Sequence, residues 1–233
     1  DRLVSIRNSA TVYTVGARIL PLPALMLRAS LATGELPPTI SQFQTQSVVH
    51  TDTSNGPVDP KRGDRRIGLD GTWTESIGGS HSVRPTHAQT LTLGVVLNPD
   101  GGGGPRVSLD YSRTLQTGEI VPFYLSAAQL LAAEADYPDR VIRAPLTTAD
   151  VAAGYTAGRV TSLDTSVINA GRSVVETIDG RFDWRLPAVT WGDVRLYGAV
   201  TWQPTFREYG GPGRPVFSKV GYIDGPLEWR GNA

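Results

Sequence analysis

Strict alternation of apolar and polar residues between Arg181 and Trp202 is the feature that most restricts how this chain can fold. The first arm, "RFDWRL" (181–186), alternates charged residues with Phe, Trp and Leu. After a turn, the second arm, "VRLYGAVTW" (194–202), alternates in the same way. A period of two predicts a β-hairpin in which each strand has one apolar and one polar face.

The solvent that each face meets separates two kinds of protein. In a soluble sandwich the apolar face points to the core, whereas in an outer-membrane barrel it points to lipid and the polar face lines the lumen. The barrel interpretation assigns two sets of residues. The lipid-facing set is Phe182, Trp184, Leu186, Val194, Leu196, Val200 and Trp202, and the lumen-facing set is Arg181, Asp183, Arg185 and Arg195.

Composition excludes several classes of protein. Hydrophobic residues make up 39% of the 233 residues, which is too apolar for a disordered chain. Lys+Arg and Asp+Glu both number 22, so the basic excess of a nucleic-acid-binding protein is absent and we expect no nucleic-acid partner. There are no cysteines and hence no disulfides or thiolate metal ligands. No apolar run approaches the ~18 residues of a membrane helix.

The same period-two signal recurs along the chain and predicts an all-β, antiparallel up-and-down meander. The expected strands lie near 11–20, 24–32, 86–97, 106–115, 174–187, 194–206 and 227–233. The expected long loops are 33–85, 116–172 and 207–225.

The connections alternate between short and long, so a meander would place all short turns at one end and all long loops at the other. Outer-membrane barrels have this asymmetry, with short periplasmic turns and long external loops. We therefore expect part of a large transmembrane β-barrel. One long loop contains "SAAQLLAAEADYP" (126–138), which predicts a short helix with Ser126 as its N-cap and Pro138 after its end.

No residue pattern indicates an enzyme, a cofactor or a metal site. The three histidines, His50, His81 and His87, are scattered and form no paired ligand motif. Asp179 and Asp183 would lie about 13 Å apart along one strand, which is too far for a retaining glycosidase pair and marginal for an inverting one, so solvated charges are the favoured interpretation. The glycine runs lack the Lys-Ser/Thr that follows a phosphate-binding loop.

The long loops are the candidate binding surface, because they would gather at one mouth of the barrel. Aromatic and arginine side chains together suit an anionic or ring-bearing ligand, such as an iron-siderophore or a glycan. The candidate ligand contacts are Trp73, His81, Tyr124, Tyr137, Arg140, Arg143 and Tyr155. For each of them, packing within a loop is the alternative.

Several stretches resemble, in the same order, the barrel of bacterial TonB-dependent outer-membrane receptors. They are "YTVGARILPLPALMLRASLATGELPPTISQF" (13–43), "DPKRG" (59–63), "GGSHSVRPTHAQTLTLGVVLNP" (78–99), "RVSLDYSRTLQTGEI" (106–120), "LLAAEADYPDRVIRAP" (130–145) and "AGYTAGRVTSLDTSVINAGRSVVETIDGRFDWRL" (153–186). Thr86 stands where the family usually has Glu, and the chain contains no stretch resembling the family's plug domain or TonB box. The resemblance implies an internal to C-terminal part of the barrel.

The resemblance also implies a function and a location. The chain would belong to a receptor in the bacterial outer membrane that imports a bulky nutrient, with TonB supplying energy through the plug domain. The surrounding partners would be outer-membrane lipid and a small ligand such as a siderophore or oligosaccharide. Two alternatives from other classes remain: a soluble β-sandwich that binds carbohydrate, and a secreted glycan-active enzyme.

Overall fold

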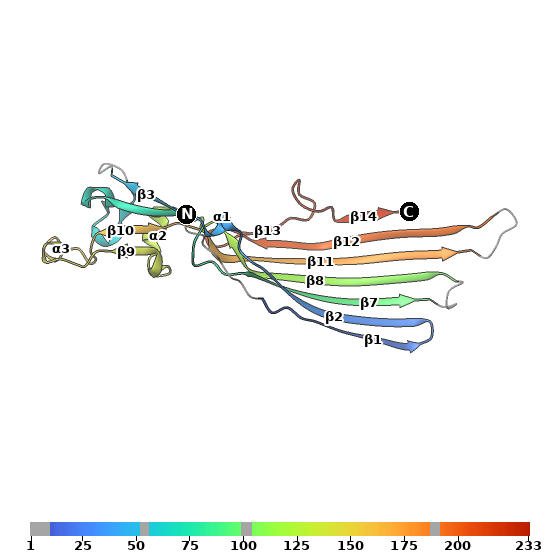
Figure 1. Ribbon diagram of the computed structural model, residues 1–233. Coiled ribbons are helices and arrows are strands. Elements are labelled where there is room, and N and C mark those ends of the chain that lie inside the picture. The colour runs from blue at the N-terminus through green and yellow to red at the C-terminus, as the bar shows by residue number, and fades with distance from the viewer. Residues whose placement is uncertain (1–9, 52–55, 99–103, 187–191) are drawn as a thin grey trace, which may run out of the picture.

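The computed structural model describes residues 10–51, 56–98, 104–186 and 192–233, and in these residues β-structure predominates (Figure 1). The largest sheet has the order β1-β2-β7-β8-β11-β12-β13, with β14 also paired to β12, and each of these pairs is antiparallel. Its strands are β1 (Thr14–Leu22), β2 (Leu25–Leu36), β7 (Thr86–Leu97), β8 (Arg106–Val121), β11 (Ile168–Arg185), β12 (Arg195–Tyr209), β13 (Val216–Ser218) and β14 (Trp229–Asn232). The chain is therefore an all-β antiparallel meander, as the sequence predicts.

The long strands run side by side, and their connections differ at the two ends of the sheet (Figure 1). One end carries the β1–β2 turn at 23–24, the C-terminal ends of β7 and β11, and the N-terminal ends of β8 and β12. The other end carries the elements formed by the long connections. The strands expected near 106–115, 174–187 and 194–206 are longer at this second end, where Arg172 pairs with both Thr117 and Tyr209.

The expected long loops 33–85 and 116–172 contain short strands and helices in addition to the one helix that the sequence predicts. Residues 37–51, 56–85 and 122–167 build a compact unit beyond the strand ends, which we call the cap (Figure 1). Its four-stranded sheet has the order β3-β6-β10-β9, and β6 and β10 are parallel although Thr74 and Ser162 belong to different loops. The loops of two successive hairpins thus pair with each other.

The cap contains short elements throughout. Its strands are β3 (Thr45–His50), β4 (Val58–Asp59), β5 (Arg65–Arg66), β6 (Trp73–Gly78), β9 (Val141–Arg143) and β10 (Val160–Asp164). Its helices are α1 (Ile40–Phe43), η1 (Pro60–Arg62), η2 (Ile67–Asp70), α2 (Ala127–Ala132), η3 (Pro138–Arg140) and α3 (Thr148–Ala152). No helix among the described residues is long and apolar enough to cross a membrane.

The predicted helix is α2, and its start follows from its sequence. Ser126 accepts a hydrogen bond from the backbone N–H of Gln129, and the Gln129 side chain accepts one from the backbone N–H of Ser126. This capping box satisfies backbone donors that the first helical turn leaves unpaired. It orients α2 so that Leu130 and Leu131 are buried.

The buried hydrophobic core lies in the cap rather than on the large sheet. Its residues are Ile67, Trp73, Phe123, Leu130, Leu131, Val141, Val160 and Leu163. They come from both long connections, so burial of their side chains holds the two connections together. The large sheet is a single layer on which many large apolar side chains are exposed, whereas Val96 is buried.

The third expected loop, 207–225, is shorter than predicted and lies along β12. The strand β12 continues to Tyr209, and β13 returns to pair with it through Glu208 and Phe217. The strand expected at 227–233 is β14, whose Trp229 pairs with Trp202. The rings of these two tryptophans are stacked with their centroids 5.3 Å apart.

Candidate functional site

One side of the large sheet, which we call the apolar face, carries hydrophobic side chains across six strands. Residues that pair across neighbouring strands lie on the same face, so the register identifies its members. One row of paired residues is Ala17, Ala29, Leu93, Tyr111, Ile178 and Trp202. The next row towards the hairpin ends is Ile19, Leu27, Val95, Leu109, Gly180 and Val200.

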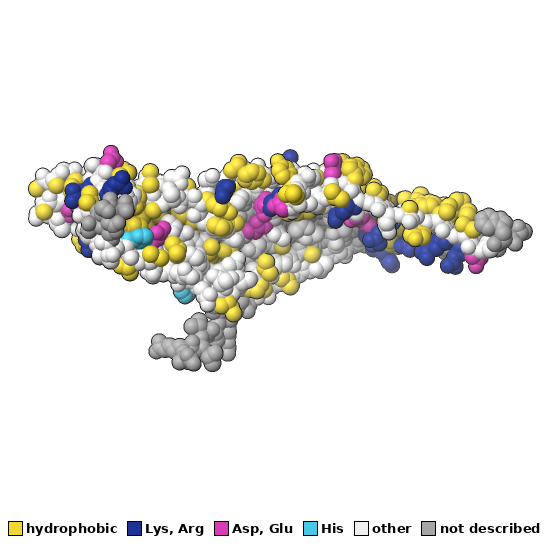
Figure 2. Space-filling model, turned by 90° about the horizontal axis from the view of Figure 1, so that it is seen from above, with side chains coloured by type: hydrophobic (Ala, Val, Ile, Leu, Met, Phe, Trp, Pro, Cys, Tyr) yellow, Lys and Arg dark blue, Asp and Glu magenta, His cyan; other side chains and the backbone are white. Residues whose placement is uncertain are grey.

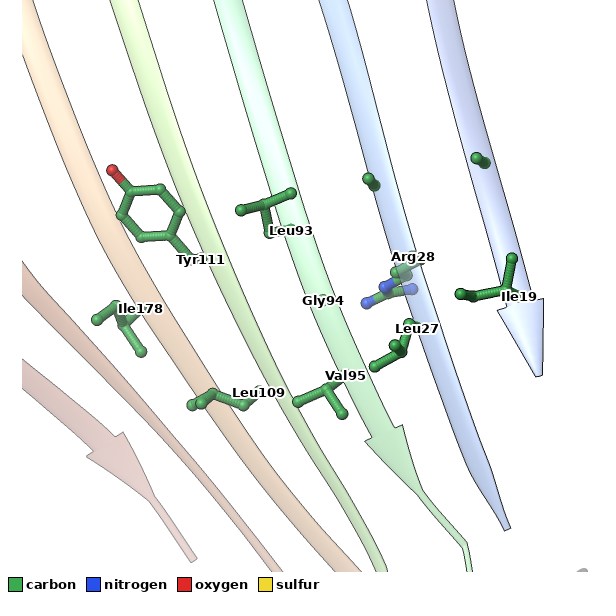
Figure 3. A pocket seen from close by; sticks show the side chains of 11 residues that line it. Ile19, Leu27, Arg28, Leu93, Gly94, Val95, Leu109, Tyr111 and Ile178 are labelled. Atoms are coloured by element: carbon green, nitrogen blue, oxygen red, sulfur yellow. The ribbon is translucent and has the colours of Figure 1, made fainter. Parts of the chain in front are cut away.

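The apolar face is exposed and only gently hollowed. Figure 3 shows side chains from β1, β2, β7, β8 and β11 spread side by side around a shallow depression of about 490 Å³. Eleven of its side chains, all large aliphatic residues or Phe, are 37 to 65% exposed. They are Val15, Ile19, Leu27, Leu91, Leu93, Leu97, Val107, Leu109, Phe182, Leu196 and Val200. A soluble monomer rarely exposes a continuous apolar surface of this extent.

The apolar face ends at charged residues on the side nearest the cap. Beyond Tyr111 and Ile178 the next paired residues on β8 and β11 are Arg113 and Glu176, whose side chains form an ion pair at 3.4 Å. On β7 the corresponding position is still apolar, at Leu91. The border between apolar and charged residues therefore lies nearer the hairpin ends on β8 than on β7. Such a shift from strand to strand is expected when the strands are tilted relative to a flat apolar layer.

The opposite side of the sheet, the polar face, carries hydroxyls and charges of both signs. Ser112 and Thr177 hydrogen-bond across β8 and β11 at 2.6 Å, and Thr90 and Thr114 do so across β7 and β8 at 3.0 Å. Near the hairpin ends, hydrophobic side chains gather on one side of the sheet and Lys and Arg side chains on the other (Figure 2).

A bidentate ion pair spans three strands of the polar face. Arg28 on β2 donates to both carboxylate oxygens of Asp110 on β8, with two contacts of 2.7 Å and a third of 3.0 Å from Nε. Gly94 on β7 lies between them, and a Cβ there would be 2.1 Å from Asp110 Oδ1. The missing side chain of Gly94 thus makes room for the pair. An isolated glycine in a strand is the sequence signal for such a close approach.

A β-bulge in β12 changes which residues of that strand face outwards. Ile178 pairs with Trp202 but Glu176 pairs with Thr205, so β12 has one more residue than β11 between these pairs. Pro204 lies within the bulge, where a missing N–H donor is tolerated. As a result Arg207 lies on the same side of the sheet as Trp202, although simple alternation would place it on the polar face.

A buried ionic cluster holds the two halves of the cap together. Arg143 on β9 donates to Asp59 at 2.6 Å and to Glu134 at 2.7 Å, and Lys61 contacts Glu134 at 3.1 Å. Asp59 is completely buried. Burial alone would raise the pKa of Glu134, but hydrogen bonds from Arg143 and Lys61 outweigh it and lower that pKa. Burial likewise opposes the charge of Arg143, yet its two carboxylate partners raise its pKa.

A second arginine joins the same two halves at the base of α3. Arg62 donates to Asp70 at 3.0 Å and to Asp150 at 2.8 Å, and its guanidinium lies 4.2 Å from the centroid of the Tyr155 ring. Hydrogen bonds from the hydroxyl and backbone N–H of Thr147, together with the one from Arg62, lower the pKa of Asp150 to about 2. Asp150 is therefore a carboxylate over the physiological range of pH.

Three of the predicted ligand contacts are engaged inside the cap. Trp73 is 4% exposed, and its ring stacks on His50 with centroids 3.9 Å apart. Arg140 is buried and donates to the backbone carbonyls of Asp164 and Ser166. Arg143 forms the ionic cluster. The loops fold around these side chains, which explains why aromatic and arginine residues are concentrated there.

The other four predicted contacts each have a different neighbour, and two of them, Tyr137 and Tyr155, are half-buried. Tyr137 packs edge-on against Phe123, and His81 is exposed with Nδ1 3.2 Å from the hydroxyl of Thr45. Tyr155 lies beneath Arg62. Tyr124 is 42% exposed and lies beneath the guanidinium of Arg214.

Tyr124 and Arg214 line a hollow where β8 and β12 meet the cap. The hollow has a volume of about 400 Å³, and its wall also includes Phe217 and Lys219. Lys219 forms an ion pair with Glu208 at 2.9 Å. Sequence reasoning identified Tyr124 but not Arg214 or Lys219, because only the return of β13 onto β12 brings them beside it. Within the described ranges, no group of three or more His, Asp or Glu side chains is arranged to hold a metal ion.

Comparison with known proteins finds similarity only among solved structures. No protein-family model matches the chain, and no curated protein matches it. A siderophore receptor, PirA from Acinetobacter baumannii, matches over 90% of this chain with 13% sequence identity and a TM-score of 0.48. PirA from Pseudomonas aeruginosa, also a siderophore receptor, matches over 84% with 14% identity and a TM-score of 0.43. The chain spans 24% and 30% of the lengths of these two structures.

Proposed function

We propose that this chain forms part of the wall and external mouth of an outer-membrane β-barrel transporter of the TonB-dependent receptor type. The observation that carries the proposal is the pairing of an exposed apolar face with a polar, ion-paired face on one layer of strands. Lipid would cover the apolar face, and the polar face would line a water-containing lumen. The order of motifs that resemble this family in the sequence supports the same proposal.

Strand length and the position of the cap agree with this arrangement. A membrane strand needs about 9–11 residues, and β7, β8, β11 and β12 contain 12, 16, 18 and 15 residues. The longer strands would extend beyond the bilayer at the end that carries the cap. The cap would then face the outside, and adjoining strands would pair with the sheet edges, since unpaired strand edges are not tolerated in lipid.

The β-sandwich alternative requires a second sheet against the apolar face. Over the part of the chain that the structure describes, the four-stranded sheet lies beyond the strand ends instead of on that face (Figure 1). The carbohydrate-binding sandwich is therefore the weaker proposal. No cluster described above favours a glycan-active enzyme.

The ligand we propose is a bulky nutrient such as an iron-siderophore or an oligosaccharide, imported with energy from TonB through a plug domain. Among the predicted contact residues, Tyr124 is the best placed, because an exposed aromatic ring beside Arg214 and Lys219 suits an anionic, ring-bearing ligand.

Uptake by cells tests this function. Cells that carry the gene are compared with cells in which residues 1–233 are deleted, using radiolabelled ferric siderophores and oligosaccharides with and without a protonophore. We expect deletion and protonophore each to abolish uptake of one ligand class, and Tyr124→Ala with Arg214→Ala to reduce it. Uptake of all ligands that is independent of the chain would contradict the proposal. A sequence of the gene on both sides of the chain would show whether it encodes a plug and further strands.

A further inference from the structure

The border between the apolar face and the cap carries a groove with an unusual combination of residues. Ala170, Arg172 and Val174 of β11 line one side, and Arg207 and Tyr209 of β12 with Val216 of β13 line the other. The groove has a volume of about 480 Å³. Arg172 pairs with Tyr209 and Val174 with Arg207, so the two arginines are diagonal neighbours on one face.

One row of residues, Glu176 on β11 and Thr205 on β12, separates this groove from the apolar face. Along β11 the residues that share its side of the sheet are Ile178, Glu176, Val174 and Arg172 in turn. Along β12, Trp202 is followed by Thr205, Arg207 and Tyr209, because the bulge shifts the phase. A long molecule that extends from the groove along the sheet would therefore meet the two guanidinium groups, then Glu176 and Thr205, and then the apolar face.

The groove carries an excess of positive charge. Glu176 is the nearest carboxylate on this side, and it contacts Arg113 at 3.4 Å and the hydroxyl of Tyr111 at 3.0 Å. Among the residues that the structure describes, neither Arg172 nor Arg207 is in direct ion-pair contact with a carboxylate, although Arg207 attracts Glu176 over a longer distance, and both arginines are exposed. Guanidinium groups bind phosphate oxygens in a bidentate geometry, and diagonal neighbours about 7–8 Å apart can reach one phosphate.

We propose that this groove binds the phosphate headgroup of an anionic lipid in the leaflet nearest the cap, with Arg172 and Arg207 as the phosphate ligands. The inference rests on the proposed function, because it requires lipid against the apolar face. Val174 and Val216 would contact the first methylenes of the lipid, and the acyl chain would continue over Trp202. Basic side chains at a membrane surface each favour an anionic lipid by about fivefold.

Quenching of Trp202 by brominated lipids tests the inference. The full transporter proposed above is placed in mixed micelles of neutral detergent and lipid, in a background that retains Trp202 and the buried Trp73 as its only tryptophans. The lipid is phosphatidylcholine with a minor share of phosphatidic acid, and bromine is placed on the acyl chains of one or the other. Strand geometry puts Trp202 roughly 10–15 Å below Arg207, within the reach of a chain whose headgroup lies in the groove.

We expect brominated phosphatidic acid to quench Trp202 at least about fivefold more per molecule than brominated phosphatidylcholine does. The ratio should return to about one in Arg172→Gln/Arg207→Gln. The matched control, Arg106→Gln/Arg181→Gln on the polar face, should leave the ratio unchanged. Circular dichroism of each variant would verify that the sheet is retained.

Three other outcomes overturn the inference and separate it from the proposed function. Equal quenching by both lipids in the unsubstituted chain would mean that lipid covers the apolar face but the arginines do not select phosphate. If millimolar inorganic phosphate removed the preference for phosphatidic acid, the arginines would form a site for free phosphate and not for a lipid headgroup. Absence of quenching by either lipid would contradict the lipid-facing sheet itself, and the inference with it.

Discussion

Arg28 and Asp110 are 82 residues apart in sequence, and they form a bidentate ion pair over Gly94, which occupies the strand between them. The pair fixes the relative positions of β2, β7 and β8 on the polar face. The residues on either side of Gly94, Leu93 and Val95, point to the apolar face and are large. Gly94 points to the polar face, where only a hydrogen atom leaves room for the ion pair.

Adding a methyl group at Gly94 should break this pair. In Gly94→Ala the new Cβ would overlap Asp110 Oδ1, so the carboxylate must move away from Arg28. We expect the free energy of unfolding in detergent micelles to fall by about 1–2 kcal/mol. The matched control is Gly34→Ala on β2, where the nearest contact would be an ordinary 3.8 Å. The same loss in both variants, or an unchanged effect of Gly94→Ala in an Asp110→Ala background, would contradict this role.

An arginine on the apolar face should lower the free energy of unfolding, whereas an arginine at the next residue, on the polar face, should not. Val200→Arg places a guanidinium on the face proposed to meet lipid, and we expect a loss of ~2–4 kcal/mol if Val200 lies near the middle of the bilayer. Thr201→Arg places it on the polar face beside Asp179, to which Thr201 donates a hydrogen bond. Chemical unfolding in micelles of both variants compares the two faces directly, and equal losses would refute the assignment.

Replacing Arg143 should destabilise the cap more than replacing an exposed arginine does. Arg143→Ala leaves the buried carboxylates of Asp59 and Glu134 without their main partner, which typically costs about 3–5 kcal/mol. Arg65→Ala removes a more exposed partner of Asp70 and should cost about 1 kcal/mol or less. Trp73 fluorescence reports cap unfolding in both, because this side chain lies in the cap core. Similar losses would show that the cluster does not hold the cap together.

The cap should lose stability in acid. The folded-state pKa of Asp150 is lowered to about 2 from 3.8, and that of Glu134 is also lowered. A lowered pKa stabilises the fold above the unfolded-state value, and the contribution disappears as pH falls through the folded-state value. We therefore expect the denaturant concentration at the midpoint of cap unfolding to decrease as the pH is lowered from about 5 to about 2. Asp150→Asn should flatten this dependence, whereas Asp139→Asn, at an exposed site, should leave it unchanged.

The large sheet could be predicted from the sequence because residues close together in the chain determine its strands and their two faces. Alternation between Arg181 and Trp202 fixes two strands and their faces, and the alternation of short and long connections fixes which ends meet. Ser126 and Gln129 specify the start of α2 in the same local way. The isolated Gly94 carried a signal of close approach that is easy to overlook in an otherwise regular strand.

The cap could not be predicted in this way, because its structure depends on contacts between distant segments. Strands β6 and β10 are short and pair in parallel across 88 residues, as Thr74 with Ser162, so neither has a local partner. Trp73 and Arg143 resemble ligand contacts in sequence, and only the fold reveals that they are buried. The bulge at Pro204 is a similar case, since it reverses the phase of alternation after a strand that otherwise reads as regular.

Lipid accessibility along β12 is the measurement that tests the central claim most directly. The chain has no cysteine, so single cysteines at each position from 195 to 209 can carry a nitroxide label in lipid–detergent micelles. We predict that labels at 196, 198, 200 and 202 collide with oxygen dissolved in lipid, that labels at 195, 197, 199 and 201 collide with a water-soluble nickel reagent, and that the phase reverses beyond Pro204. Equal access of the water-soluble reagent to both faces would contradict the account, because the apolar face would then not be covered by lipid.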